Sequence, residues 1–264
     1  MLPLFDDLPT RKFPIITVTL IVMNTLVLIF MFGLMLNSKD TTNEFVYKYS
    51  VIPWEITNGK HVSVDVLEST HPKPPAPSEA DSNPSGKNIY LTLLTHMFLH
   101  GGILHLLGNM WFLWLFGSNV EEVFGGLPFL LFYLACGVCA ALTQWAVYSS
   151  EVVAMVGASG AISGVMGAYL VIYPKQKVFS IIFFWPAWVP AWVLMLAWLA
   201  YQALFGLISQ IGSASGGTAW FAHLGGIASG VLFTLLLYPW LKPRRDRLKD
   251  VYVPRYPSYM KKAS

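Results

Sequence analysis

The sequence predicts an all-α, polytopic membrane protein, and three observations support this fold class. Hydrophobic residues make up 55% of the 264 residues and charged residues only 12%, whereas a soluble domain carries about 25% charged residues. Several apolar stretches approach or exceed the roughly 20 residues that cross a bilayer as a helix. Basic residues gather between these stretches in a pattern that fits an even number of crossings. The six predicted spans are residues 13–36, 103–119, 127–149, 157–173, 190–210 and 218–241.

The positions of lysine and arginine predict the orientation of the chain. Basic residues lie in the segment 1–12, directly after the fourth span, and in the tail 242–264, which holds eight of the 17. Six crossings place these three groups on one side, and basic loops favour the cytoplasmic side. We therefore expect a cytoplasmic N-terminal segment (1–12), a membrane domain (13–241) with an external loop (37–102), and a basic cytoplasmic tail (242–264).

Two segments between the spans differ from ordinary loops. The segment 178–190 is too apolar for a loop in water, and its two prolines argue against a continuous helix. We expect it to lie at the membrane interface before the fifth span. The stretch 71–86 in the external loop is rich in proline and serine, and this composition predicts a flexible segment.

Four polar side chains inside the predicted spans are the candidate functional residues. Polar groups at membrane depth are costly and mark functional sites. A helical rise of about 1.5 Å per residue places the four in one layer below the outer surface. No aspartate or glutamate lies within the six predicted spans, so a Ser-His-Asp triad is not expected. The four residues are His105 and Asn109 in the second span, Ser159 in the fourth and His223 in the sixth.

Nucleophilic catalysis is the chemistry that fits these residue types. A serine hydroxyl becomes a useful nucleophile when a neighbouring base accepts its proton, and His223 is the histidine available to Ser159. His105 and Asn109 are four residues apart, so they share a helix face and can donate hydrogen bonds to an oxyanion.

Small residues in the fourth and sixth spans predict close packing of the two helices. Such packing would bring a serine and a histidine within hydrogen-bonding distance, although glycines that only pack helices remain an alternative. The glycines that we assign to this role are Gly157, Gly160, Gly164, Gly226 and Gly230.

His96 and His100 are also four residues apart and raise the question of a metal. A zinc protease would need the pattern H-E-x-x-H, but Met97 stands where the glutamate should be. We therefore expect these histidines to make structural hydrogen bonds, and we expect no metal or other cofactor.

Three stretches together resemble the rhomboid family of intramembrane serine proteases. They are HMFLHGGILHLLGNMWFLWLFGSNVEEVFG (96–125), GASGAISGVMGAY (157–169) and AHLGGIASG (222–230). The resemblance covers about residues 13–241 in the order and spacing of the spans. It implies a six-transmembrane-helix, rhomboid-like bundle that cleaves transmembrane proteins in or near their membrane segments.

The resemblance also implies roles for individual residues. Ser159 matches the nucleophile and His223 the general base, while His105 and Asn109 match the side chains of the oxyanion hole. His96 and His100 match histidines that brace the first external loop. Some members carry an aromatic residue one helical turn after the serine, stacked on the histidine. Ser163 occupies that place here, so the sequence leaves open what orients His223.

Gating roles follow only from the resemblance. It implies that the loop 209–217 acts as a lid and that the fifth span acts as a side gate.

Substrates would be single-pass or other transmembrane proteins embedded in the bilayer, and no nucleic-acid partner is expected. The compact six-span form without a presequence suits a bacterial plasma membrane, and the membrane of a eukaryotic organelle is the alternative.

Two other functions are compatible with the same residues. A catalytically inactive rhomboid-like protein would bind or sort membrane helices, and it would be expected to lack the serine or the histidine. A channel or transporter would use His105, Asn109 and His223 as a polar path. The sequence contains no inverted repeat or pair of broken helices that would favour a transporter.

Overall fold

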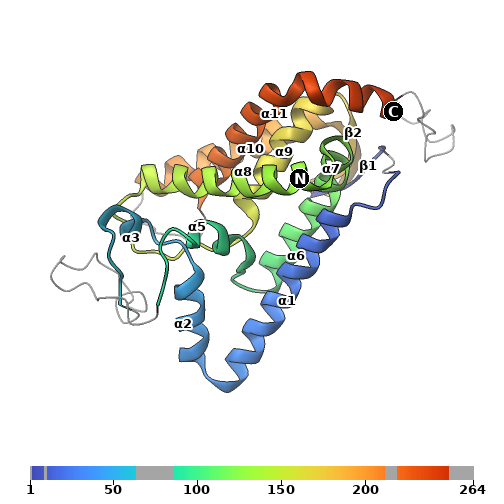
Figure 1. Cartoon of the computed structure of the whole chain (residues 1–264). Coiled ribbons are helices and arrows are strands. Elements are labelled where there is room, and N and C mark those ends of the chain that lie inside the picture. Colours follow the sequence, from blue (N-terminus) through green and yellow to red (C-terminus); the bar gives the residue numbers. More distant parts are fainter. Residues whose placement is uncertain (1, 9–10, 64–85, 212–218, 250–264) are drawn as a thin grey trace.

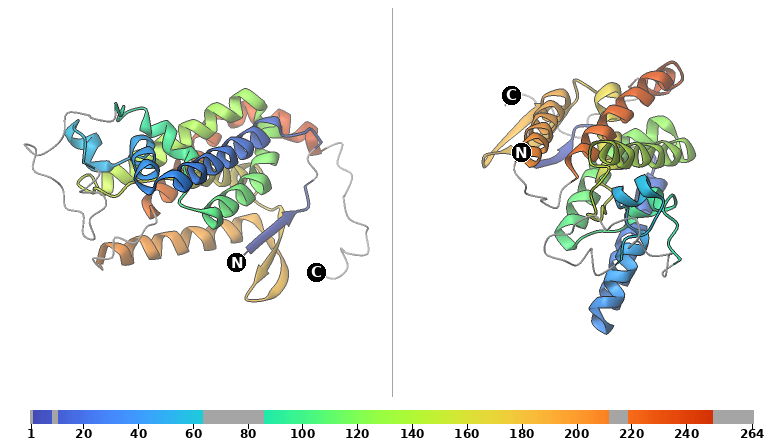
Figure 2. Two further views of the ribbon diagram at one scale, coloured as in Figure 1. Left: turned by 90° about the horizontal axis from the view of Figure 1, so that it is seen from below. Right: turned by 90° about the vertical axis from the view of Figure 1, so that its left-hand side faces the viewer.

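The structure is a computed structural model that describes residues 2–8, 11–63, 86–211 and 219–249. It is mostly helical, with a small sheet at one end and short loop helices at the other (Figures 1 and 2). The helices are α1 (Ile15–Asn37), α2 (Lys39–Tyr49), α3 (Pro53–Asn58), α5 (Thr92–Thr95), α6 (Ile103–Phe112), α7 (Ser118–Phe124), α8 (Gly126–Val147), α9 (Ser159–Ile172), α10 (Ala191–Ile211) and α11 (Trp220–Lys249). A 3₁₀ turn, η1 (His96–Phe98), follows α5, and a π-helical segment, η2 (Leu113–Gly117), joins α6 to α7. The strands are β1 (Leu2–Asp6), β2 (Lys177–Ile182) and β3 (Trp185–Pro190).

Apolar helices occupy all six predicted span positions, but only some of them have both the length and the composition that crossing a bilayer requires. Within the described residues four helices meet that standard, namely Ile15–Asn37, Ile103–Phe124, Gly126–Val147 and Trp220–Leu248. Two shorter apolar helices, Ser159–Ile172 and Ala191–Phe205, occupy the other positions. A polytopic membrane protein is therefore confirmed, while six crossings remain a prediction.

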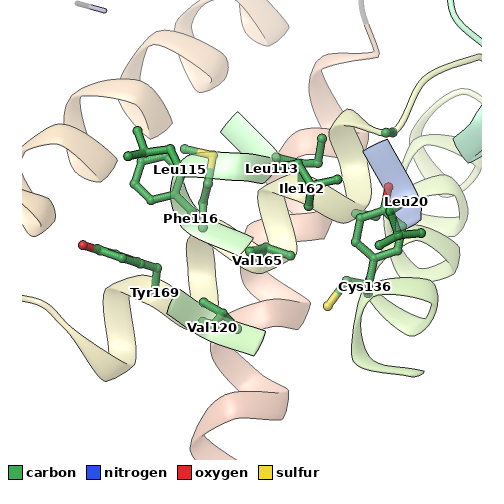
Figure 3. Packing of buried hydrophobic residues seen from close by; sticks show 14 of the residues in the cluster. Leu20, Leu113, Leu115, Phe116, Val120, Cys136, Ile162, Val165 and Tyr169 are labelled. Carbon is green, nitrogen blue, oxygen red and sulfur yellow. The ribbon is translucent and has the colours of Figure 1, made fainter. Parts of the chain in front are cut away.

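Helix α9 forms the centre of the bundle. It packs between α8 and α11, and every residue from Gly160 to Tyr169 is buried. Figure 3 shows Val165 and Tyr169 of α9 facing Phe116 of η2 and Val120 of α7. Helix α1, in contrast, exposes large apolar side chains such as Leu26 and Ile29. Apolar side chains on the outside and a close-packed helix inside suit a lipid environment.

A three-stranded antiparallel sheet corrects the all-α prediction. Its order is β1-β2-β3, and β2 and β3 form a hairpin from the segment 178–190 that we expected at the interface. The prolines of β3 do prevent a helix there, but the backbone instead forms a ladder with β2. β1 comes from the N-terminal segment and pairs with β2, a partner about 175 residues away in sequence that local patterns do not reveal.

A buried carboxylate near the end of the second span fixes the start of α1. The predicted span ended at residue 119, but the helix continues to Phe124, so Glu121 lies within it. Glu121 accepts hydrogen bonds from the backbone N–H groups of Ile16 (2.9 Å) and Thr17 (2.7 Å) and from the Thr17 hydroxyl (2.8 Å). The first N–H groups of a helix lack intrahelical partners and favour negative charge. Glu121 therefore caps α1 from another helix.

Two other predicted boundaries also differ from the structure. Helix α11 does not end at residue 241 but continues to Lys249 through Pro239 and Pro243, so the first part of the basic tail is helical. The external loop contains α2, α3 and α5. The predicted flexible stretch 71–86 lies outside the described residues except for residue 86. Residues 209–211 of the predicted lid 209–217 belong to the end of α10, and the rest of the lid lies outside the described residues.

Removal of the Glu121 carboxylate should destabilise the protein. We expect Glu121→Ala to cost at least about 2 kcal/mol, because buried N–H donors at the start of α1 lose their acceptor. Thermal unfolding in detergent micelles would measure the change. Glu122→Ala is the matched control, since Glu122 accepts only an exposed bond from the Arg11 backbone and should change stability little. Equal losses in both variants would contradict the capping role.

The partly buried Asp6 in β1 should make stability depend on pH. Its carboxylate accepts hydrogen bonds from Asn119 (2.8 Å) and the Tyr169 hydroxyl (2.6 Å), yet burial dominates and raises its pKa to about 7. A carboxyl whose pKa is raised in the folded state stabilises it fully below the pKa of the unfolded chain, about 3.9. That contribution is lost as pH rises toward and through about 7. Asp6→Asn should flatten the unfolding temperature between about pH 4 and 8; an unchanged slope would contradict this assignment.

Candidate functional site

The site forms where the start of α9 meets the start of α11. Ser159 is the first residue of α9 and His223 lies in the first turn of α11. The Ser159 hydroxyl donates to the Nε2 atom of His223 at an Oγ···Nε2 distance of 2.8 Å. The two residues are 64 positions apart in sequence, so the fold brings together the pair that the sequence predicted.

Glycine allows α9 and α11 to pack closely enough for this contact. A Cβ atom on Gly226 would meet the carbonyl oxygen of Gly160, and one on Gly230 would meet that of Gly164. On the other side of α9, a Cβ on Gly160 would lie 2.6 Å from the Cβ of Ala140 in α8. Real side-chain carbons do not approach that closely. Four of the five predicted packing glycines therefore lie at helix contacts.

Gly157 has a different place from the one predicted. It precedes α9 and has a φ of +124°, a left-handed conformation that favours glycine. A Cβ there would lie 2.8 Å from Cε1 of His105. The absence of a side chain at Gly157 thus makes room for the His105 ring rather than for a neighbouring helix.

His105 faces the serine with a defined tautomer. Its Nδ1 accepts a hydrogen bond from the Gly101 backbone N–H at 3.3 Å, so the ring proton of the neutral imidazole belongs on Nε2. A Cβ built on Gly157 would be 2.9 Å from that Nε2, which places the N–H donor beside the turn that leads into Ser159. Asn109 lies one helical turn further along α6, where its amide donates to the His105 carbonyl at 2.9 Å.

A single cavity connects the four predicted residues. It has a volume of about 380 Å³ and is lined by Ser159, His223, His105 and Asn109 together with apolar side chains. Such a mixture of apolar walls and a few convergent polar groups is typical of ligand and substrate sites. Ser159, which lines this cavity, is the first residue of α9, and the N–H groups of the first helical turn have no intrahelical acceptors.

The second nitrogen of His223 has a partner that the sequence analysis missed. Gln202 of α10 lies with its Oε1 2.8 Å from His223 Nδ1, and the Trp198 ring lies 5.7 Å from the imidazole, centroid to centroid. The signal in the sequence was a glutamine in the middle of a predicted apolar span. Ser163, which occupies the place of an aromatic residue, instead donates to the Ser159 carbonyl at 2.7 Å.

His96 and His100 lie just before α6 rather than at the serine. The Nδ1 of His96 bonds to the Thr92 carbonyl at 3.0 Å, and the His96 carbonyl accepts the N–H of Gly157 at 2.9 Å. His96 therefore ties the loop to the turn before α9. The predicted hydrogen bonds of His100 are not found among the described residues, where neither of its buried ring nitrogens has a partner; its ring instead packs edge-on against His105 at a centroid distance of 5.1 Å. Burial lowers the pKa of both histidines to about 4, so both are neutral near pH 7.

A metal site in this protein would need a group of three or more metal-binding side chains. Among the residues that the structure describes, no group of three or more histidine, cysteine, aspartate or glutamate side chains has such an arrangement.

Comparison with known proteins gives the class to which this fold and site belong. The model of the rhomboid domain matches residues 87–240, more than half of the chain, and this range includes all four site residues. The chain belongs to the rhomboid family. Together with its four long apolar helices, this makes it an integral membrane protein.

Individual relatives come from mitochondria and from a bacterium. Rhomboid protein 1, mitochondrial, of Saccharomyces cerevisiae is 29% identical over 161 residues, which are 60% of this chain and 44% of the relative. RHOMBOID-like protein 6, mitochondrial, of Arabidopsis thaliana is 33% identical over 56% of this chain and 44% of its own length. Rhomboid protease GluP of Bacillus subtilis is 45% identical over 88 residues, or 33% of this chain and 17% of its own length.

The chain spans less than half the length of each of these relatives. Two of the three names specify mitochondria, and the comparison therefore does not support the bacterial plasma membrane that we expected.

The contact between α9 and α11 can be tested with one methyl group. Gly226→Ala should destabilise the protein by about 1–3 kcal/mol, because the added Cβ overpacks the interface. Gly33→Ala is the matched control, since Gly33 lies in α1 with nothing within 4 Å of its Cβ position. That variant should be neutral or slightly stabilising. Unfolding temperatures in micelles would measure both, and an unchanged Gly226→Ala protein would contradict the close approach.

Proposed function

We propose that the protein is an intramembrane serine endopeptidase that cleaves transmembrane-helix substrates with a Ser-His dyad. The observation that carries this proposal is the 2.8 Å contact between Ser159 Oγ and His223 Nε2 inside a cavity among apolar helices. A nucleophile within hydrogen-bonding reach of an oriented base is the arrangement that covalent catalysis requires. Membership of the rhomboid family supports the same reading.

The first half of the reaction forms an acyl-enzyme. Ser159 Oγ attacks the carbonyl carbon of the scissile peptide bond while His223 Nε2 takes the hydroxyl proton. The carbonyl oxygen becomes a tetrahedral oxyanion. As the intermediate collapses, the carbon–nitrogen bond breaks and His223 returns the proton to the leaving amine. The substrate acyl group is then joined to Ser159 as an ester.

The second half releases the product with water. His223 accepts a proton from a water molecule, whose oxygen attacks the ester carbonyl. The second tetrahedral intermediate collapses with cleavage of the bond to Ser159, and His223 gives the proton back to Oγ. The overall reaction consumes one water and produces a carboxylic acid and an amine, and no cofactor takes part.

His105, Asn109 and the backbone N–H of Ser159 are the proposed oxyanion donors. The His105 Nε2–H is set by the Gly101 bond to Nδ1, so it can donate without a change of tautomer. The second amide hydrogen of Asn109 is available beside its bond to the His105 carbonyl. Preorganised donors of this kind lower the barrier by about 3 kcal/mol each. His96 and His100 hold the loop that carries Gly101.

The proposed substrates are transmembrane proteins whose helix unwinds near the cleavage site. The helix α9 is only 14 residues long, roughly 21 Å, which is shorter than the hydrocarbon core of about 30 Å. Its first residue therefore lies below one membrane surface if its last residue reaches the other. We propose the orientation deduced from the basic residues, with both termini cytoplasmic and the site nearer the external side.

The dyad predicts that either member is essential. Ser159→Ala and His223→Ala should each lower cleavage of a helical substrate in liposomes by at least about 1,000-fold, since removal of one member disables the unit. A fluorophosphonate probe should label the wild-type protein on Ser159 and should not label Ser159→Ala.

Ser163→Ala is the matched control for the serine. Its hydroxyl bonds only to the Ser159 carbonyl among the contacts described, so this variant should retain most activity. Full cleavage by Ser159→Ala would refute the proposal. Cleavage by neither wild type nor variants, with no labelling by the probe, would instead favour a rhomboid-like protein that binds membrane helices.

A further inference from the structure

We propose that Gln202 is a positioning residue that holds the imidazole of His223 in the tautomer needed for general-base catalysis. This inference rests on the proposed function, because it assigns a role to a residue behind the catalytic base. Gln202 lies on α10, whereas the dyad lies on α9 and α11. The site would thus depend on three helices rather than two.

The hydrogen bonds on the two ring nitrogens define one proton arrangement. A side-chain amide oxygen can only accept, so the contact of 2.8 Å between Gln202 Oε1 and His223 Nδ1 requires the proton on Nδ1. The neutral ring then has its lone pair on Nε2, which faces the Ser159 hydroxyl at 2.8 Å. The other tautomer would set two acceptors, Nδ1 and Oε1, against each other, and its proton on Nε2 would occupy the lone pair that has to accept the serine proton.

The surroundings of Gln202 make this contact specific. Gln202 is 4% exposed, and a buried amide without a hydrogen-bond partner would destabilise the fold. Trp198 lies four residues earlier, on the same face of α10, with its ring beside the imidazole. One helix face thus supplies both an acceptor for Nδ1 and an aromatic wall for the ring.

This arrangement answers the question that Ser163 raised in the sequence. The residue one turn after the nucleophile carries no ring, and its hydroxyl bonds to the backbone. The orienting groups come instead from α10. Because the start of α10 is fixed by bonds from Ala191 to the Gln176 carbonyl (2.7 Å) and from Trp192 to the Pro174 carbonyl (3.1 Å), Gln202 keeps its place relative to the end of α9.

Variants at Gln202 separate positioning from packing. Gln202→Leu fills a similar volume without an acceptor, and we expect kcat to fall about tenfold, the value of one neutral hydrogen bond, with little change in KM. Gln202→Glu keeps an acceptor oxygen and should retain more activity than Gln202→Leu. Leu204→Ala, an exposed change on the same helix, is the control and should behave as wild type.

A spectroscopic measurement tests the tautomer itself. The ¹⁵N chemical shifts of His223 in protein labelled at histidine and held in micelles distinguish a protonated Nδ1 from a protonated Nε2. Wild type, Gln202→Glu and Leu204→Ala should show the proton on Nδ1 at a pH where the ring is neutral. Gln202→Leu should show a mixture of the two forms at an unfolding temperature close to that of wild type.

The outcomes for Gln202 and for the dyad are distinguishable. A Gln202→Leu protein with wild-type kcat, or one with reduced activity and an unchanged tautomer, overturns the positioning role and leaves the dyad intact. Cleavage that persists in Ser159→Ala overturns the proposed function instead. Loss of activity in Gln202→Leu, a mixed tautomer and partial rescue by glutamate together establish the positioning role of Gln202.

Discussion

The approach of α9 to α11 is the constraint on which the site depends. Where Gly226 and Gly230 face the carbonyls of Gly160 and Gly164, the two backbones touch without intervening side chains. Lipid tails are as apolar as leucine, so close van der Waals contact rather than water exclusion drives such helices together. Ser159 and His223 sit at one end of this contact. Their hydrogen bond follows from the backbone spacing and needs no third acidic residue to hold the two helices in place.

Much of the site was predictable because polar groups are costly in lipid. Ser159, His105, Asn109 and His223 each stood out against an apolar span, and the structure brings all four to one cavity. The positions of the apolar helices were predictable for the same reason. Their ends were less so, since Glu121 lies inside a helix although its charge suggested a boundary. A charge can enter the bundle when backbone N–H groups surround it, and these donors come from the start of α1, a distant part of the chain.

Other features depended on partners that sequence spacing does not reveal. The strand β1 is recognisable only once β2 is beside it, and β2 itself was obscured by two prolines in the adjoining strand. Gln202 resembled a tolerated polar residue until His223 lay 2.8 Å away. Gly157 was assigned to helix packing because it precedes other glycines at similar spacing. Its actual role follows from a positive φ and from the ring of His105.

The pairing of β1 with β2 has a consequence for the order in which the molecule assembles. Pro3 lies opposite Ser180, so the first strand emerges from the ribosome long before its partner exists. Three long apolar helices and α9 must be synthesised in the interval. The sheet can close only after these helices have been made, and contacts so distant in sequence form slowly. β1 therefore cannot pair until β2 has been synthesised, and α10 and α11 follow β2 in the chain.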